Sequence, residues 1–60
     1  MKIGDRVIVD SEWSSMYGWT GTIVRDLDEY GSGWVSVDLD HNPVDDLPVP
    51  FREPELRVIA

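Results

Sequence analysis

Aromatic side chains suited to binding gather in one short stretch of the sequence. Trp13, Met16, Tyr17 and Trp19 fall within seven residues that otherwise hold only serine and glycine. Large aromatic residues and methionine are enriched at the centres of protein interfaces. We therefore expect Trp13, Met16 and Tyr17 to form a partner-binding patch, and we assign Trp19 to the core or its lid. The alternative is that some of these rings fold back to cap a barrel too small to close itself. A sharper hypothesis is an aromatic cage for a methylated cation, with Glu12 nearby and Tyr30 and Trp34 contributing.

Carboxylates form the second candidate site. A three-residue hairpin loop at 31–33 would place Tyr30 opposite Trp34 and Leu27 opposite Val37. On the outer side Asp28 would then face Ser36, and Asp26 would face Asp38, with Asp40 further along. Like charges directly opposed on a sheet destabilise it. A bound cation, an arginine such as Arg57 or a basic partner should therefore offset them, and the alternative is a solvated acidic face.

Together these two features give the candidate partner-binding residues. They are Trp13, Met16, Tyr17, Asp26, Asp28, Trp34, Asp38 and Asp40.

Catalytic and metal-binding chemistry has little to rest on. The chain has no cysteine and a single histidine, His41, which lies in a turn-like sequence where polar residues are expected for local reasons. Gly31-Ser32-Gly33 is followed by a strand pattern and not by a helix, so it is not a phosphate-binding loop. No spacing resembles a calcium loop. We expect no enzyme activity, no cofactor and no metal site.

Length and charge limit the class of protein. The 60 residues carry five Lys and Arg against twelve Asp and Glu, a formal charge of −7. We expect a single domain over 1–60 that depends on one tight core, since disulfides and a zinc site are excluded by composition. The longest apolar run, Val7-Ile8-Val9, is far too short to cross a membrane. Without a signal-like start, a cytoplasmic protein is the expectation, or a virion-associated one if a phage encodes it.

Short β-strands must position these residues. The alternation of apolar and polar residues predicts strands over 2–10, 20–24, 34–40, 49–52 and 56–60, with one turn of 3₁₀ helix at 53–55. Val35, Val37 and Leu39 should face the core, and Phe51 should plug it. Arg25 has inward parity between Ile23 and Leu27, so a bulge should re-aim it or it should emerge at the rim. Five short strands predict a small, bent barrel whose closure hides its edges.

The chain resembles a known family at several of these segments. Gly4–Val9, Gly18 with Gly21–Val24, and Trp34–Asp38 resemble the KOW motif, and Glu55–Ile59 resembles the last strand usual in SH3-like barrels. The resemblance spans nearly the whole chain. It implies an all-β fold: a small SH3-like, KOW-type five-stranded β-barrel with one 3₁₀ turn before the last strand. Gly21 matches the family's central glycine, which a backbone with no room for a Cβ would explain.

The resemblance implies a binding module, because KOW-type barrels bind RNA or protein. A domain of charge −7 with scattered basic residues would be repelled by phosphates. We therefore expect a non-catalytic protein-binding or structural module, such as a phage or prophage accessory or capsid-associated protein. Its partner should present a basic or apolar surface. The alternatives are a nucleic-acid binder that stacks bases on tryptophan, an acidic nucleic-acid mimic and a regulatory subunit of a larger enzyme.

Overall fold

The fold is all-β, as the alternation of the sequence predicts. A computed structural model describes residues 1–26, 33–41 and 47–60. Its elements are β1 (Arg6–Val9), β2 (Thr20–Asp26), β3 (Trp34–Leu39), β4 (Val49–Arg52), the 3₁₀ turn η2 (Glu53–Glu55) and β5 (Leu56–Val58). Across these described ranges, no helix is long and apolar enough to cross a membrane.

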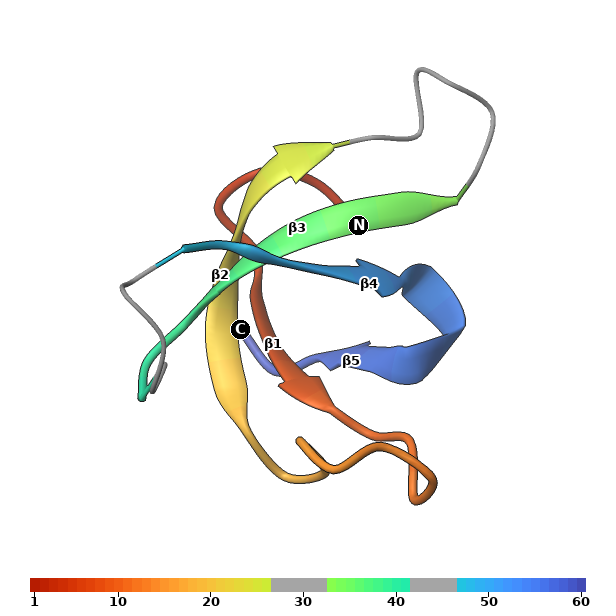
Figure 1. The fold of residues 1–60 in the computed structure, drawn as a ribbon. Helices are drawn as coiled ribbons and strands as arrows, with labels where there is room; N and C mark the ends of the chain where they lie inside the picture. The colour runs from red at the N-terminus through yellow and green to blue at the C-terminus, as the bar shows by residue number, and fades with distance from the viewer. Residues whose placement is uncertain (27–32, 42–46) are drawn as a thin grey trace.

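The five strands form one curved antiparallel sheet in the order β4-β3-β2-β1-β5 (Figure 1). The expectation of a fully closed barrel is wrong, because among the described residues the edge strands β4 and β5 do not pair with each other. The turn η2 explains this. The Glu53 N–H donates to the Gly33 C=O and so extends the β3–β4 pairing, while the Glu55 C=O accepts from Asp10 beside β1. The two ends of η2 are thus hydrogen-bonded to opposite sides of the sheet, and the edge strands β4 and β5 diverge at this turn.

The core lies inside the curve of the sheet. Its buried side chains come from all five strands: Val7, Val9, Ile23, Val35, Val37, Leu39, Phe51 and Leu56. Both the predicted inner face of β3 and the predicted core role of Phe51 are confirmed. Met16, Trp19 and Val49 are partly buried and pack against this cluster.

Gly21 lies at the centre of the sheet, opposite Val7 on β1 and Leu39 on β3. A Cβ at this position would come within 2.6 Å of the Asp38 carbonyl oxygen and 2.7 Å of the Val37 Cγ1. The predicted reason for this glycine is therefore confirmed: the neighbouring strand leaves no space for a side chain.

The predicted pairing of β2 with β3 is wrong. Asp26 lies opposite Val35, and Asp38 lies opposite Thr22, so the two carboxylates do not face each other. The pairing shifts at a bulge between Ile23 and Arg25, which confirms the expected irregularity and leaves Arg25 exposed. The predicted tight hairpin, with the positions of Leu27, Asp28 and Tyr30, falls on residues outside the described ranges.

Candidate partner-binding loop

The connection between β1 and β2, residues 10–19, is closed at its base by two backbone hydrogen bonds. We call this segment the aromatic loop. The Val9 N–H donates to the Trp19 C=O at 2.8 Å, and the Gly18 N–H donates to the Val9 C=O at 2.9 Å. Gly18 has a φ of +87°, which is the left-handed region that glycine adopts without steric penalty. These two bonds therefore hold together the end of β1, where the loop begins, and the residues directly before β2, where it ends.

Successive tight turns order the interior of the aromatic loop. The Ser14 N–H donates to the Ser11 C=O, the Tyr17 N–H to the Ser14 C=O, and the Trp19 N–H to the Met16 C=O, at 3.0 to 3.2 Å. The Ser14 hydroxyl also accepts from the Met16 N–H at 3.1 Å. These bonds satisfy the backbone locally, as an exposed segment with fixed geometry requires.

The four apolar side chains of the aromatic loop divide into two pairs. Met16 and Trp19 are partly buried and pack on the core, so they anchor the loop. Trp13 and Tyr17 point outward, with 96% and 53% of their surfaces exposed. Of the three residues expected in the patch, the structure thus leaves Trp13 and Tyr17 at the surface and gives Met16 a mainly supporting position. The role expected for Trp19 is confirmed.

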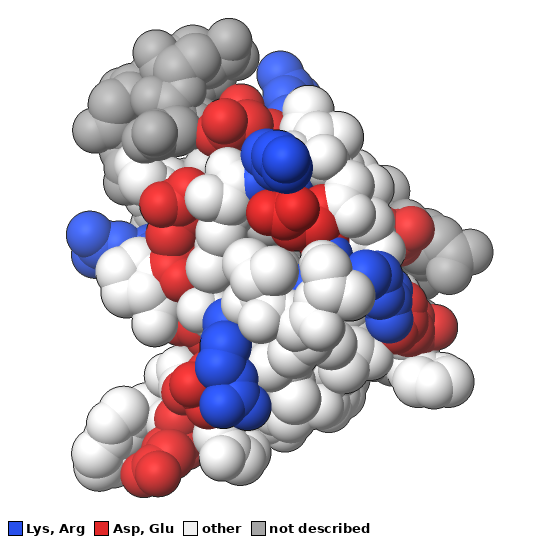
Figure 2. All heavy atoms as spheres, turned by 180° about the vertical axis from the view of Figure 1, so that it is seen from behind, with Lys and Arg blue, Asp and Glu red and all other residues white. Residues whose placement is uncertain are grey.

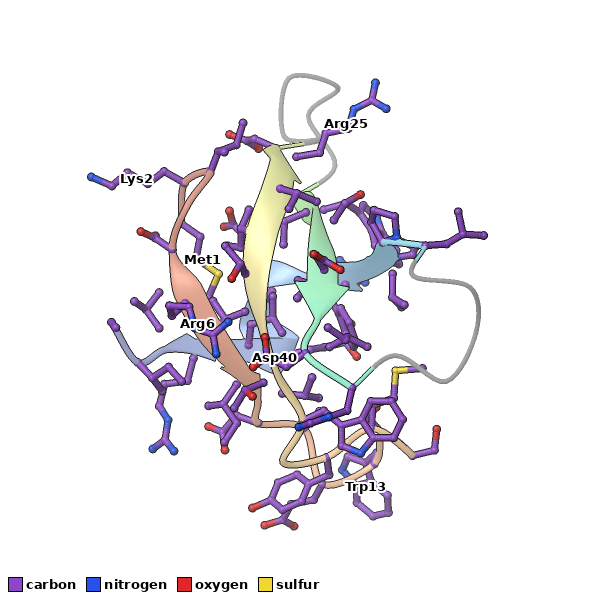
Figure 3. The ribbon with its side chains drawn as sticks, turned by 90° about the vertical axis from the view of Figure 1, so that its left-hand side faces the viewer. Met1, Lys2, Arg6, Trp13, Arg25 and Asp40 are labelled. Atoms are coloured by element: carbon purple, nitrogen blue, oxygen red, sulfur yellow. The ribbon has the colours of Figure 1, made fainter. Side chains whose placement is uncertain are left out.

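A shallow hollow adjoins the aromatic loop. It has a volume of about 310 Å³ and is lined by Gly18, Trp19, Thr20 and His41. His41 follows β3, so the hollow lies where the aromatic loop meets the C-terminal end of β3. Figure 3 shows Trp13 at this end of the molecule, with Arg25 at the opposite end. An exposed indole and a hollow are thus available to a partner on one end of the fold.

Asp40, one of the predicted contact residues, is held by this chain's own side chains. Arg6 donates to both of its carboxylate oxygens, at 2.9 and 2.6 Å, and the Thr20 hydroxyl donates to Oδ2 at 2.7 Å. Arg6 also donates to the Thr22 hydroxyl at 2.9 Å. The hydrogen bond from Arg6, with that from Thr20, holds the pKa of Asp40 well below its ordinary value. Asp40 therefore fastens β3 to β1 and β2 across the outer face of the sheet.

The structure does not gather the remaining carboxylates into one acidic face. Asp26 and Asp38 are both exposed, but Asp26 pairs with Val35, three residues or about 10 Å along β3 from Asp38. Asp28 lies outside the described residues. On the face drawn in Figure 2, Lys and Arg side chains alternate with Asp and Glu side chains. Arg6 was not expected from the sequence to pair with a carboxylate. It alternates with the buried Val7 and Val9 on β1, and this alternation already indicated that its side chain lies on the outer face.

Trp34 lies away from the aromatic loop. It begins β3, whereas His41 follows the other end of that strand, about 20 Å away along an extended chain. The Arg52 guanidinium carbon stands 5.9 Å from the centroid of its ring, within cation–π range. With 36% of its surface exposed, Trp34 is a separate feature of the β3–β4 pair.

No protein-family model matches the chain, and no curated protein matches it. Among the described residues, no three His, Asp or Glu side chains are placed to hold a metal ion. What the structure defines is a small antiparallel domain that carries an ordered, exposed aromatic loop.

Proposed function

We propose that this chain is a non-catalytic protein-binding or structural module, and that the aromatic loop is its contact surface. One observation carries the proposal: Trp13 is 96% exposed on a loop whose backbone is held by its own hydrogen bonds. Folding normally buries a tryptophan ring, whereas in this fold the ring of Trp13 stays exposed to solvent. Tyr17, which is also exposed on the same loop, adds to the apolar surface available to a partner.

The energy available from Trp13 is large for a domain of this size. A tryptophan side chain buries roughly 150–250 Å² of surface when it is enclosed. At about 25 cal/mol per Å² of apolar area, that corresponds to about 4–6 kcal/mol before the cost of association is subtracted. Tryptophan and tyrosine are also the residues most enriched at interface hot spots. Trp13 is thus the side chain whose removal should weaken binding most.

Charge near Trp13 indicates the character of the partner. The aromatic loop contains Asp10 and Glu12, both exposed, and no Lys or Arg. A partner with an apolar centre and basic residues at its rim would complement this surface. Carboxylates at such a rim mainly accelerate encounter and fix orientation, so added salt should slow association more than it speeds dissociation.

We further propose that the fold is the SH3-like, KOW-type barrel in an incompletely closed form. The strand order β4-β3-β2-β1-β5, with η2 directly before β5, supports this assignment. Gly21 supports it as well, because it fills the position at which the KOW resemblance requires a residue without a side chain.

The test is affinity capture from an extract of the source organism with three forms of the protein. The unaltered chain should retain a protein partner after nuclease treatment, and Trp13→Ala should lose it with little change in thermal midpoint. Trp34→Ala is the matched control, because it removes an exposed tryptophan far from the aromatic loop and should leave capture intact. Each form is first checked for its circular dichroism spectrum and unfolding midpoint.

Two outcomes would overturn the proposal. If Trp13→Ala unfolds the domain, the ring supports the fold and is not a contact surface. If the captured material is nucleic acid, and any co-purifying protein is lost with it on nuclease treatment, base stacking on the tryptophans is the better interpretation.

A further inference from the structure

The two edges of the sheet expose different backbone groups. In an antiparallel pair the N–H and C=O of one residue point the same way, and successive residues alternate between the partner strand and the open side. The Glu53 N–H donates to the Gly33 C=O, which sets the alternation on β4. Val49 and Phe51 therefore face β3, and Pro50 and Arg52 face the open side.

The β4 edge is blocked at every described position that could donate. Pro48 and Pro50 have no N–H. The Arg52 N–H is occupied, because it donates to the Glu55 Oε1 at 3.1 Å. Proline and local capping are common protections of an edge strand against pairing with another chain.

The β5 edge lacks these protections. The Ile59 N–H donates to the Arg6 C=O and the Glu55 C=O accepts from the Asp10 N–H, so Glu55, Arg57 and the Ile59 N–H face β1. The alternation ends there, because the Arg6 N–H donates to the Ala60 C=O. Val58 therefore directs its N–H and C=O to the open side, and no hydrogen bond from a described residue meets them there. The preceding outward N–H, that of Leu56, is already bonded to the Glu53 C=O within η2.

The side chain of Val58 is also incompletely covered. Val58 lies opposite the buried Val7, so it has the parity of the core face. Yet 45% of its surface is exposed, since β5 is the last strand of the sheet. One further strand beside β5 would satisfy the free backbone groups and cover this side chain together.

We propose that the added strand is β5 of a second copy of this chain, paired antiparallel about a two-fold axis at Val58. In this register the two Val58 residues exchange both N–H···O=C bonds, and each Arg57 lies opposite the second copy's Ile59. No like charges are directly opposed. A head-to-tail contact of β5 with β4 would lack donors on the β4 side, so the interface is isologous and closes as a dimer.

Net charge determines how this dimer responds to salt. Each copy carries −7, and the two charges repel at low ionic strength. Salt screens this repulsion, because the Debye length falls from about 30 Å at 0.01 M to about 3 Å at 1 M. The dimer should therefore strengthen with added salt.

Sedimentation equilibrium over a range of protein and salt concentrations tests the proposal. The unaltered chain should show a monomer–dimer equilibrium that shifts toward dimer as salt rises. Val58→Pro removes the outward N–H without breaking the β1–β5 pairing, and it should raise the dimer dissociation constant about tenfold or more. Val58→Thr is the matched control, because it keeps the N–H and the branched shape, and it should dimerise nearly as well.

Amide hydrogen exchange on the unaltered chain keeps the proposal testable should Val58→Pro fail to fold. The Val58 amide should exchange quickly in dilute solution and slowly at high protein concentration, while the exchange of the Arg52 amide on the other edge, which is bonded to Glu55, should not depend on protein concentration. A monomer at every concentration and salt would overturn the proposal. A dimer that survives Val58→Pro, or one that leaves the Val58 amide unprotected, would overturn it equally.

Discussion

Replacing Gly21 with alanine should cost this domain a large part of its stability. The added Cβ would stand 2.6 Å from the Asp38 carbonyl oxygen, 2.7 Å from the Val37 Cγ1 and 3.0 Å from the Leu39 Cα. Overpacking against side chains typically costs about 1–3 kcal/mol, because side chains can shift. Here two of the three contacts are β3 backbone, which cannot retreat without opening the β2–β3 pairing. We therefore expect a loss of about 3 kcal/mol or more.

The total stability of the domain sets the scale of this loss. At about 0.05–0.15 kcal/mol per residue, 60 residues give about 3–9 kcal/mol. For a domain of this size each kcal/mol corresponds to about 4–8 °C in the midpoint, so the shift should be at least about 12 °C. Thermal and urea unfolding followed by circular dichroism measure the loss. A fully unfolded variant also agrees with the prediction if the stability of the unaltered domain lies at the lower end of this range.

Gly4→Ala separates this steric effect from the general cost of replacing a glycine. Gly4 has a φ of +95°, and a Cβ there would meet no atom within 4 Å. Its substitution should cost only backbone strain, roughly 1–2 kcal/mol. If Gly21→Ala proves no more destabilising than Gly4→Ala, then β3 can move away from β2, and the steric argument is wrong.

Two further predictions concern the ion pair and the core. Because the pKa of Asp40 is lower in the folded state, its contribution to stability is present at neutral pH and is lost as the pH falls below the ordinary value of 3.8. Asp40→Asn should thus be less stable than the natural chain at pH 7, and the difference should shrink in acid; a constant difference from neutral to acidic pH, measured by urea unfolding, would contradict the pairing with Arg6. Phe51→Ala should lower stability by about 3–5 kcal/mol, because Phe51 is 4% exposed and packs in the core. A loss below about 1 kcal/mol in the same assay would mean that Phe51 is not a core residue.

Much of the fold could be predicted because burial imposes local periodicity. Val35, Val37 and Leu39 alternate with polar residues, and a strand with one buried face requires this pattern. The turn η2 was predictable from Glu53-Pro54-Glu55, since proline suits the first turn of a helix. The close approach at Gly21 was expected because this residue matches the central glycine of the motif that the chain resembles.

The pairing of β2 with β3 was not predictable, because alternation fixes which residues share a face but not which residues pair. Asp26 lies opposite Val35 and not opposite Asp38, a displacement of three residues, and the bulge between Ile23 and Arg25 adds one more. The Arg6–Asp40 pair escaped prediction for a related reason. Its members are 34 residues apart, and only the sheet brings them together.

Residue types could not predict which side chains of the aromatic loop are buried and which are exposed, since Met16 and Tyr17 are adjacent and suit either environment. The burial of two of these side chains has a consequence for binding. Met16 and Trp19 pack on the core while the domain folds, so the conformational entropy of ordering the loop is already lost before any partner arrives. A partner that encloses Trp13 then meets a preorganised surface and loses less of its binding energy to ordering. This arrangement explains how a chain of 60 residues can hold a tryptophan exposed: the loop that carries it is stabilised by its own two anchors and does not depend on Trp13.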